Sequence, residues 1–219
     1  MFNNSDSSQN GELLFLNRIK DEINIAFDVG SRYDSEFLNI NAEVHYFEPV
    51  PDFLDKLSKT ENKNKKSYFN NFGLGNSNET IVYYPKYESF CNRKKTFGAD
   101  ENKLDKLHLC IKKAVDYIVE KNIKSIDFLK IDTEGYEFDV LRGFEDIITS
   151  VKIIQFEYGG TFLDNNIKMV DVISYLQEKG FHRFSYITPT GTQLINDFTD
   201  HYKYCNIVCI HKNSSIVPF

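Results

Sequence analysis

The chain has 219 residues, with 32 acidic and 26 basic side chains and a formal net charge of −6. This length suits one domain, or two small ones, and a single domain of this size buries about 70% of the surface that its unfolded chain exposes. The acidic balance argues against a nucleic-acid-binding protein, because such proteins neutralise phosphates with clustered Lys and Arg. An aromatic fraction of 15% excludes a wholly disordered chain.

The start of the chain is polar and carries neither the basic residues nor the apolar run of a signal peptide. No apolar run approaches the roughly 18 residues of a membrane helix. The four cysteines form no CxxC pair, so we expect reduced thiols. These features predict a cytoplasmic protein without a membrane partner, with a flexible tail over residues 1–10 and one domain over residues 11–219.

Apolar runs alternate with helical patterns along the rest of the chain. The expected strands are residues 23–29, 44–48, 68–72, 80–84, 109–115, 126–131, 151–157, 181–187 and 205–211. The expected helices are residues 12–20, 36–40, 52–59, 116–122, 136–148 and 167–179, with Asp116 as an N-cap. Near-continuous apolar strands between helices predict a parallel sheet covered on both faces. The predicted fold is therefore a single doubly wound, Rossmann-like α/β domain.

Acidic residues follow four of the expected strands. They are Asp28, Glu48, Asp132 with Glu134, and Glu157. Open parallel sheets bind ligands beyond the carboxyl ends of their strands. Because these ends meet at one edge of a sheet, the acids predict a shared ligand site there.

The loop after the first strand favours a nucleotide cofactor without phosphate. Gly30 allows close approach of the backbone, and Glu48 can accept hydrogen bonds from ribose hydroxyls. A dinucleotide requires glycines that this loop lacks, and Asp34 would repel a phosphate. S-adenosylmethionine carries a sulfonium and an ammonium, which suit Asp28 and its neighbours.

Two further residues of this loop have alternative roles. Arg32 could pair with the methionine carboxylate of the cofactor if its side chain faces inward. Ser31 and Asp34 also fit a capping box for the following helix. The two interpretations are compatible with each other.

Four motifs together resemble one known family. They are FDVG at residues 27–30, FEPVP at residues 47–51, IDFLKIDTEGYE followed by VLRG at residues 126–143, and IIQFE at residues 153–157. The chain is similar, over roughly residues 23–211, to the FkbM family of S-adenosylmethionine-dependent methyltransferases. The loop after FDVG departs from the family pattern, which has a second glycine there.

The resemblance implies a class I methyltransferase domain with a seven-stranded, mostly parallel sheet whose last strand is antiparallel. It also implies methyl transfer to oxygen. By position, Asp28, Gly30 and Ser31 would line the methionine end of the cofactor, and Glu48 would hold the ribose. Asn71 and Phe72 would lie near the adenine.

A hydroxyl acceptor must lose a proton during methyl transfer, and a positioned base accelerates that step by about 10²–10⁴-fold. Asp132 is the first candidate for this base or for a contact with the acceptor, and Glu157 is the second. No metal site is predicted, although these two carboxylates could instead share a divalent ion. Lys130 lies within an apolar strand and is expected to pair with a neighbouring acid.

The acceptor is the least defined part of the prediction. Residues 85–108 and 158–166 are expected to build its wall, and the family implies a hydroxyl on a sugar, a glycan or a secondary metabolite. The basic run at residues 93–95 fits a solvated loop better than an anionic ligand site. Two alternatives stay open, namely a degenerate Rossmann-like binding domain without activity and an NAD-dependent oxidoreductase.

Overall fold

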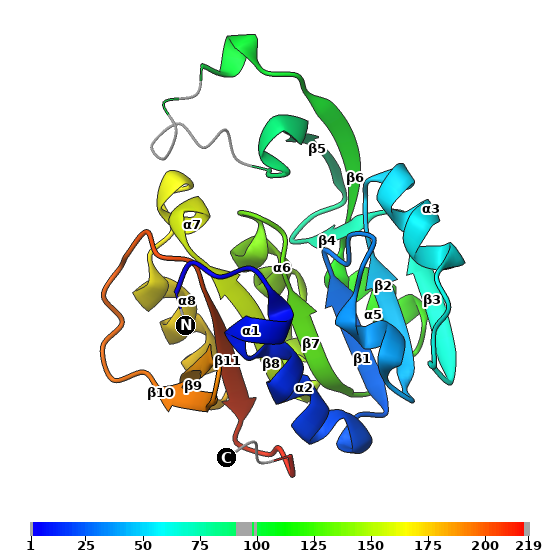
Figure 1. Ribbon diagram of the computed structural model, residues 1–219, viewed down its shortest axis with the longest axis vertical. Coiled ribbons are helices and arrows are strands. Elements are labelled where there is room, and N and C mark those ends of the chain that lie inside the picture. Colours follow the sequence, from blue (N-terminus) through cyan, green and yellow to red (C-terminus); the bar gives the residue numbers. More distant parts are fainter. Residues whose placement is uncertain (1, 91–97, 99, 217–219) are drawn as a thin grey trace.

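A mostly parallel sheet organises the chain (Figure 1). The computed structural model describes residues 2–90, 98 and 100–216. Among these residues, the large sheet has eight strands in the order β3-β2-β1-β7-β8-β11-β9-β10. Its strands are β1 (Ile25–Val29), β2 (Glu43–Phe47), β3 (Lys66–Asn70), β7 (Ile126–Ile131), β8 (Val151–Tyr158), β9 (Phe181–Thr188), β10 (Gly191–Leu194) and β11 (Cys205–His211).

The order of the strands creates a switch point between β1 and β7. From β1 the chain proceeds to β2 and β3, whereas from β7 it proceeds in the opposite direction to β8. Strands β3, β2, β1, β7 and β8 are parallel, and β11 runs antiparallel to both β8 and β9. A doubly wound sheet with an antiparallel last strand is therefore confirmed.

The number of strands differs from the expected seven. After β9 the chain turns at Gly191, whose φ is +146°, and pairs back onto β9 as the edge strand β10. Glycine tolerates such a backbone conformation without steric conflict. What we expected to be a loop between the last two strands is thus partly an eighth strand.

A second, smaller sheet projects above the large one in Figure 1. It has the order β4-β6-β5 and consists of β4 (Gly73–Gly75), β5 (Glu79–Tyr83) and β6 (Leu107–Lys113). The sequence predicts β5 and β6 as strands, but it predicts neither β4 nor the separation of these strands from the large sheet. Strand β6 is antiparallel to β5 and parallel to β4.

Helices cover both faces of the large sheet. They are α1 (Ser7–Asn10), α2 (Glu12–Ile19), α3 (Pro51–Lys59), α5 (Ala114–Glu120), α6 (Glu137–Gly143), α7 (Gly160–Asp164) and α8 (Met169–Glu178). Helices α2 and α3 pack on one face, together with the short 3-10 helix η2 (Glu36–Asn39). Helices α5, α6 and α8 pack on the other. Among the described residues, none of the helices is both long and apolar enough to span a bilayer.

Two helix boundaries differ from the predictions. Lys113, not Asp116, is the N-cap of α5, and Asp116 lies in the first turn of this helix. The helix expected over residues 136–148 ends at Gly143 and continues as a 3-10 helix (Glu145–Ser150). Gly143 lies so close to β4 that a Cβ there would be 1.8 Å from the carbonyl oxygen of Gly75. The close packing between α6 and β4 thus leaves no room for a side chain at position 143.

The N-terminal residues, expected to form a flexible tail, contact the rest of the domain at several points. Asn10 is buried, and its amide donates hydrogen bonds to Glu12 and to the carbonyl of Asn4. The backbone N–H of Asn3 donates to the carbonyl of Tyr204, whose own N–H donates to the side chain of Asn3. These contacts connect the start of the chain to the beginning of β11. Polar composition alone did not reveal these distant partners.

Candidate active site

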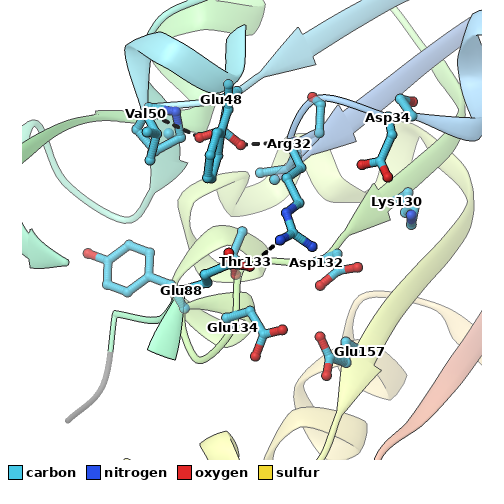
Figure 2. A pocket seen from close by; sticks show the side chains of 18 of the residues that line it. Arg32, Asp34, Glu48, Val50, Glu88, Lys130, Asp132, Thr133, Glu134 and Glu157 are labelled. Carbon is cyan, nitrogen blue, oxygen red and sulfur yellow. Dashed lines mark hydrogen bonds and ion pairs between the residues drawn. The ribbon is translucent and has the colours of Figure 1, made fainter. Parts of the chain in front are cut away.

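A cavity of about 390 Å³ lies at the carboxyl ends of β1, β2, β7 and β8 (Figure 2). Its lining includes the first loop, the acids that follow these strands, and parts of the small sheet. Among the predicted site residues, Gly30, Ser31, Arg32, Glu48, Asp132 and Glu157 line it. The prediction that strand-end acids gather at one site is met for Glu48, Asp132, Glu134 and Glu157.

Ser31 connects β1 to β2. Its hydroxyl donates a 2.8 Å hydrogen bond to the carbonyl of Asp28 and accepts one of 3.1 Å from the N–H of Phe47. The residue that caps the following 3-10 helix is Ser35, whose hydroxyl accepts from the N–H of Phe37. The capping box proposed for Ser31 is therefore wrong, and Ser31 instead fixes the loop against the sheet.

Arg32 holds the loop to β2 through its backbone. Its N–H donates a 2.9 Å hydrogen bond to Oε2 of Glu48. The backbone of Arg32 has a positive φ of 53°. Its guanidinium forms an ion pair with Glu88, as Figure 2 shows. Arg32 thus lines the cavity, which is the condition for the proposed contact with the methionine carboxylate, but its charge is already paired within the chain.

Glu48 is fixed in place at the end of β2. Its two carboxylate oxygens accept hydrogen bonds from the N–H groups of Arg32 and Val50, at 2.9 and 2.8 Å. Burial raises the pKa of Glu48 to about 7, and the nearby charge of Asp28 acts in the same direction. Each oxygen keeps a further lone pair, so Glu48 can accept donors from a ligand in the cavity.

Asp28 lies behind the cavity wall rather than in it. Its side chain is buried and accepts a 2.5 Å hydrogen bond from the hydroxyl of Ser35, while Oδ1 has no partner within the described structure. Burial raises the pKa of Asp28 to about 6. The expected contact of Asp28 with the methionine end of the cofactor is therefore replaced by a role in supporting the loop.

Asn71 and Phe72 also lie outside the cavity lining. The amide of Asn71 donates to the carbonyls of Glu48 and Pro49, and the ring of Phe72 packs 5.9 Å from that of Phe47. The apolar part of the lining near Glu48 comes instead from four other residues, Val50, Phe53, Leu74 and Ile111. Sequence analysis missed Leu74 and Ile111 because they belong to the small sheet, whose position it did not predict.

Lys130 is the centre of an ionic network in the cavity wall. Its ammonium lies 3.0 Å from Glu36 and 3.8 Å from Glu12. Glu12 accepts further hydrogen bonds from Asn10 and Gln155, at 2.6 and 2.7 Å. The expected acidic partner exists, but it comes from η2 and α2 rather than from the acids next to Lys130 in sequence.

Three carboxylates converge beside this network. Asp132, Glu134 and Glu157 each place an oxygen within 4.8 Å of the others. Burial raises the pKa of Glu157 well above its usual value, and the charges of Glu134 and Asp132 raise it further. The predicted candidates Asp132 and Glu157 are therefore brought together.

Glu137, in contrast, has a structural role. Its buried carboxylate accepts hydrogen bonds from the N–H groups of Thr133 and Gly135, at 3.0 and 3.1 Å. It therefore caps the turn that leads into α6. Glu137 is thus a carboxylate in the first turn of α6.

An aromatic wall borders the cavity opposite the large sheet. The ring of Phe90 lies 5.3 Å from that of Tyr83 and 5.7 Å from that of Tyr136, and all three residues line the cavity. Part of the segment 85–108 thus lines the cavity. The basic run at residues 93–95 lies outside the described residues. Residues 158–166, which include α7, do not contribute to the lining.

The first loop does not provide a phosphate site within the described structure. Strand β1 is followed by a loop and the short 3-10 helix η2, so no α-helix N-terminus points at the cavity from this position. Asp34 and Glu36 line the cavity here instead. A dinucleotide would meet these acids with its pyrophosphate, which disfavours an NAD-dependent enzyme.

The switch point, the acid at the end of β2 and the cavity between them define a doubly wound domain of the class I methyltransferase kind. The sequence matches the model of the methyltransferase FkbM domain over residues 28–183, which is more than half of the chain. The chain therefore belongs to the FkbM methyltransferase family. No curated protein matches it.

Several solved structures are similar to this one. A precorrin 8w decarboxylase from Methanobacterium thermoautotrophicum has 14% identity and a TM-score of 0.43, over 90% of this chain and 89% of that one. An S-adenosylmethionine-dependent methyltransferase from Thermotoga maritima, described as a possible histamine N-methyltransferase, has 11% identity and a TM-score of 0.43, over 92% and 88%. A precorrin-6y C5,15-methyltransferase from Geobacter metallireducens has 11% identity and a TM-score of 0.39, over 91% and 86%. We draw no conclusion from similarities at this level.

Proposed function

We propose that the protein is an S-adenosylmethionine-dependent O-methyltransferase that acts on a hydroxyl of a sugar, a glycan or a secondary metabolite. The observation that carries the proposal is the placement of Glu48. Two backbone N–H groups fix this carboxylate at the end of β2, where it faces the cavity at the switch point. Membership of the FkbM methyltransferase family supports the same reaction.

The charges around the cavity fit this cofactor. The acids in the lining are Asp6, Glu12, Asp34, Glu36, Glu48, Glu88, Asp132, Glu134 and Glu157, whereas the bases are Arg32 and Lys130. S-adenosylmethionine carries two cationic groups and no phosphate, so an acidic lining suits it. The volume of about 390 Å³ lies in the usual range of ligand pockets.

The lining also offers matching surfaces for the two ends of the nucleoside. Glu48 would accept hydrogen bonds from the ribose hydroxyls through its remaining lone pairs. The adjoining apolar residues Val50, Phe53, Leu74 and Ile111 would contact the adenine ring. In the proposed site, these four residues take the place near the adenine that was expected for Asn71 and Phe72.

The acids at the ends of β7 and β8 would serve the acceptor. When bound, S-adenosylmethionine supplies a methyl carbon that its sulfonium activates for in-line displacement. Asp132 would accept the proton of the acceptor hydroxyl as the oxygen attacks, and such a base contributes about 10²–10⁴-fold. Because burial keeps the pKa of Glu157 high, we assign the base to Asp132 rather than to Glu157.

The aromatic wall would hold the acceptor over this base. Tyr83, Phe90 and Tyr136 present ring surfaces to the cavity, and such surfaces can pack on a sugar ring or an apolar ring system. Holding the acceptor in the reactive geometry can lower the barrier by up to about 7–11 kcal/mol.

Calorimetric titration of S-adenosylmethionine and S-adenosylhomocysteine tests the cofactor site. Replacement of Glu48 by Ala should weaken both ligands by at least about 10-fold, because hydrogen bonds to a charged acceptor contribute about 1.5–3 kcal/mol each. Glu43→Ala is a matched control, since Glu43 lies at the opposite end of β2 and outside the cavity lining. Equal binding by the wild type and the Glu48 variant would refute the ribose assignment.

A screen with labelled S-adenosylmethionine over glycans and small hydroxylated metabolites tests the acceptor. With the acceptor found, Asp132→Asn should lower turnover by about 10²–10⁴-fold and leave cofactor affinity unchanged. Unchanged turnover would exclude Asp132 as the base. Failure of the wild type to bind either form of the cofactor would support a binding domain without activity.

A further inference from the structure

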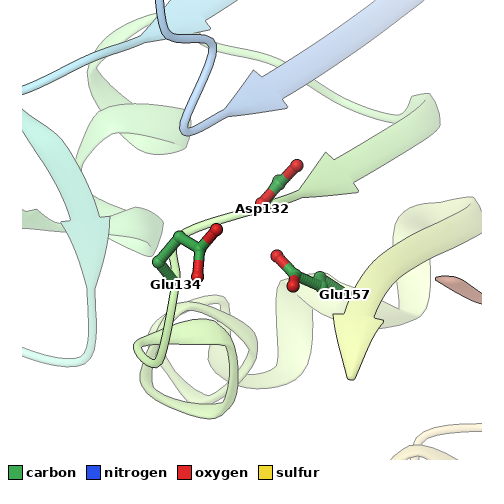
Figure 3. A group of neighbouring side chains, drawn as sticks. All are labelled: Asp132, Glu134 and Glu157. Atoms are coloured by element: carbon green, nitrogen blue, oxygen red, sulfur yellow. The ribbon is translucent and has the colours of Figure 1, made fainter. Parts of the chain in front are cut away.

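The amino-acid end of S-adenosylmethionine would bring a carboxylate into an acidic cavity. Figure 3 shows three acidic side chains gathered at the ends of β7 and β8, namely Asp132, Glu134 and Glu157, with oxygens within 4.8 Å of one another. A ligand carboxylate at this place would meet charges of its own sign. It therefore requires a cationic side chain elsewhere in the lining.

Within the described part of the chain, the cationic side chains of the lining are Arg32 and Lys130. Lys130 is only 12% exposed and pairs with Glu36 and Glu12. Arg32 pairs with Glu88, and these two side chains are 44% and 46% exposed. Water screens an exposed ion pair, so such a pair contributes little, whereas removal of a partner from a buried pair is strongly unfavourable. Arg32 is thus the cation that can change its partner.

The guanidinium of Arg32 is held in place by contacts that do not depend on Glu88. The backbone N–H of Arg32 donates to Glu48, the residue proposed to bind the ribose. Its guanidinium carbon lies 4.9 Å from the ring centre of Tyr33 and 5.9 Å from that of Phe53. Such cation–π contacts favour the guanidinium beside the rings even when its acidic partner leaves. Its planar set of donors matches the geometry of a carboxylate.

Glu88 belongs to a tight turn between β5 and β6. The short 3-10 helix Pro85–Tyr87 precedes it, its N–H closes the turn onto the carbonyl of Pro85, and its φ is +49°. The hydroxyl of Ser89 donates to a backbone carbonyl of the segment after β7, which anchors the turn beside the large sheet. Glu88 and Arg32 both line the cavity, and Figure 2 marks the ion pair between them. The turn thus presents a carboxylate to Arg32 within the cavity.

We propose that Glu88 is an internal competitor of the cofactor, which occupies on Arg32 the position that the methionine carboxylate takes. On binding, the guanidinium exchanges Glu88 for the ligand carboxylate, and Glu88 is released to water. This inference rests on the proposed function, and it assigns the partner of the amino-acid end of the cofactor. A ligand with the same nucleoside but no amino-acid tail leaves the ion pair intact.

Calorimetric titration with S-adenosylhomocysteine and with 5′-methylthioadenosine separates these two kinds of ligand. The second compound keeps the adenosine and the sulfur but lacks the amino-acid tail. Arg32→Gln should weaken S-adenosylhomocysteine by about 10–100-fold, because it removes charge-assisted hydrogen bonds, and it should leave 5′-methylthioadenosine unchanged. Arg32→Lys keeps the charge and should recover part of the loss.

Glu88→Gln should act in the opposite direction. Because the competitor is removed, S-adenosylhomocysteine should bind about 2–5-fold more tightly, which is the range expected for an exposed ion pair. The affinity for 5′-methylthioadenosine should not change. In the Arg32→Gln background the Glu88→Gln change should have no effect, since the competitor acts through the guanidinium.

Asp34→Asn is the matched control, because Asp34 lines the same cavity but forms no ion pair with Arg32 within the described structure. It should change the binding of S-adenosylhomocysteine less than Glu88→Gln does. A urea unfolding curve of each variant shows that it folds, and the Glu88→Gln result is decisive even if Arg32→Gln does not fold.

Three results would overturn the proposal. They are equal S-adenosylhomocysteine binding by the wild type and Glu88→Gln, equal tightening by Asp34→Asn, and tightening of 5′-methylthioadenosine to the same extent. If the wild type binds both ligands but these variants change neither affinity, only the exchange at Arg32 is overturned. A wild type that binds neither ligand overturns the proposed function, and this inference with it.

Discussion

Replacement of Lys130 by Met offers a sharp test of the ionic network in the cavity wall. The side chain of Lys130 is 12% exposed, and its ammonium lies between Glu36 and Glu12. Burial lowers the pKa of Lys130, but the charges of the surrounding acids, with Glu36 and Glu12 the strongest and Asp28 and Asp132 adding to them, together raise it well above its usual value. Lys130 is therefore charged at neutral pH, and its removal leaves two carboxylates without their counter-ion.

The expected loss of stability follows from this arrangement. Removal of one partner from a buried ion pair typically costs about 3–5 kcal/mol, because the remaining charge stays buried without compensation. For a chain of this length, 1 kcal/mol corresponds to about 2–4 °C in the melting temperature. We therefore expect Lys130→Met to melt about 6–20 °C below the wild type.

Lys59→Met is the matched control. Lys59 forms an ion pair with Asp55 at 2.6 Å, but both side chains are exposed, at 72% and 60%. Exposed pairs contribute about 0–1 kcal/mol. Urea unfolding at pH 7.5 gives the free energy of unfolding of both variants, each of which replaces a Lys by Met. A loss for Lys130→Met within 1 kcal/mol of that for Lys59→Met would refute the assignment of Lys130 as an essential buried counter-ion.

The pH dependence supplies a second check on the same variant. In the wild type, burial raises the pKa of Glu36, but the charge of Lys130 and the hydrogen bonds to the carboxylate together lower it by more, so the net shift is downwards. A lowered carboxylate pKa gives stability that is present above the usual value near 4.5 and is lost as the pH falls. Without Lys130 this contribution disappears, so the difference between wild type and variant should shrink as the pH falls below about 4.5.

Two further predictions concern the cofactor loop. Because the pKa of Glu48 is about 7, cofactor affinity should be about 10-fold lower at pH 6 than at pH 8, as measured by calorimetry. Asp28 and Arg32 are the charged groups near Glu48, and Asp28, with a pKa of about 6, titrates below it. Gly30→Ala should abolish cofactor binding and lower the free energy of unfolding by at least about 1–3 kcal/mol, because Gly30 has a φ of +85° and an added Cβ would lie 1.8 Å from the carbonyl oxygen of Asp132.

Matched variants define the outcomes that would contradict these two predictions. Glu48→Gln cannot ionise, so a change in affinity between pH 6 and pH 8 that persists in this variant would assign the titration to another group. Gly98 also has a positive φ, of +63°, but an added Cβ there would meet no atom within 4 Å. Equal losses of stability for Gly30→Ala and Gly98→Ala would show that backbone strain alone, and not the contact with Asp132, explains the effect.

The strands that form the site could be predicted from the sequence because their signal is local. Strand β7 begins and ends at the predicted residues, and β2 ends one residue before the predicted Glu48. Each strand is indicated by the apolar periodicity of its own residues and by the motif at its end. Since parallel strands have their carboxyl ends at one edge, the gathering of Glu48, Asp132 and Glu157 also followed from the sequence.

The sequence did not reveal which side chains face the cavity and which support it. Asp28 and Glu48 follow the same strand-end rule, yet Asp28 is buried behind the wall and Glu48 lines the cavity. The difference depends on the conformation of the loop, which contains a positive φ at Arg32. Glu88, which pairs with Arg32, comes from a segment without clear periodicity.

The sequence by itself determined a doubly wound, mostly parallel sheet, the acids at its strand ends and the family to which the chain belongs. Only the tertiary structure decided that Lys130 pairs with Glu36, 94 residues away, and that Leu74 and Ile111 complete the apolar lining. Strand formation depends on neighbours in the chain, whereas these contacts depend on register and on how distant segments pack. The acids noted at first as part of a net charge of −6 thus include three that the fold brings within 4.8 Å of one another.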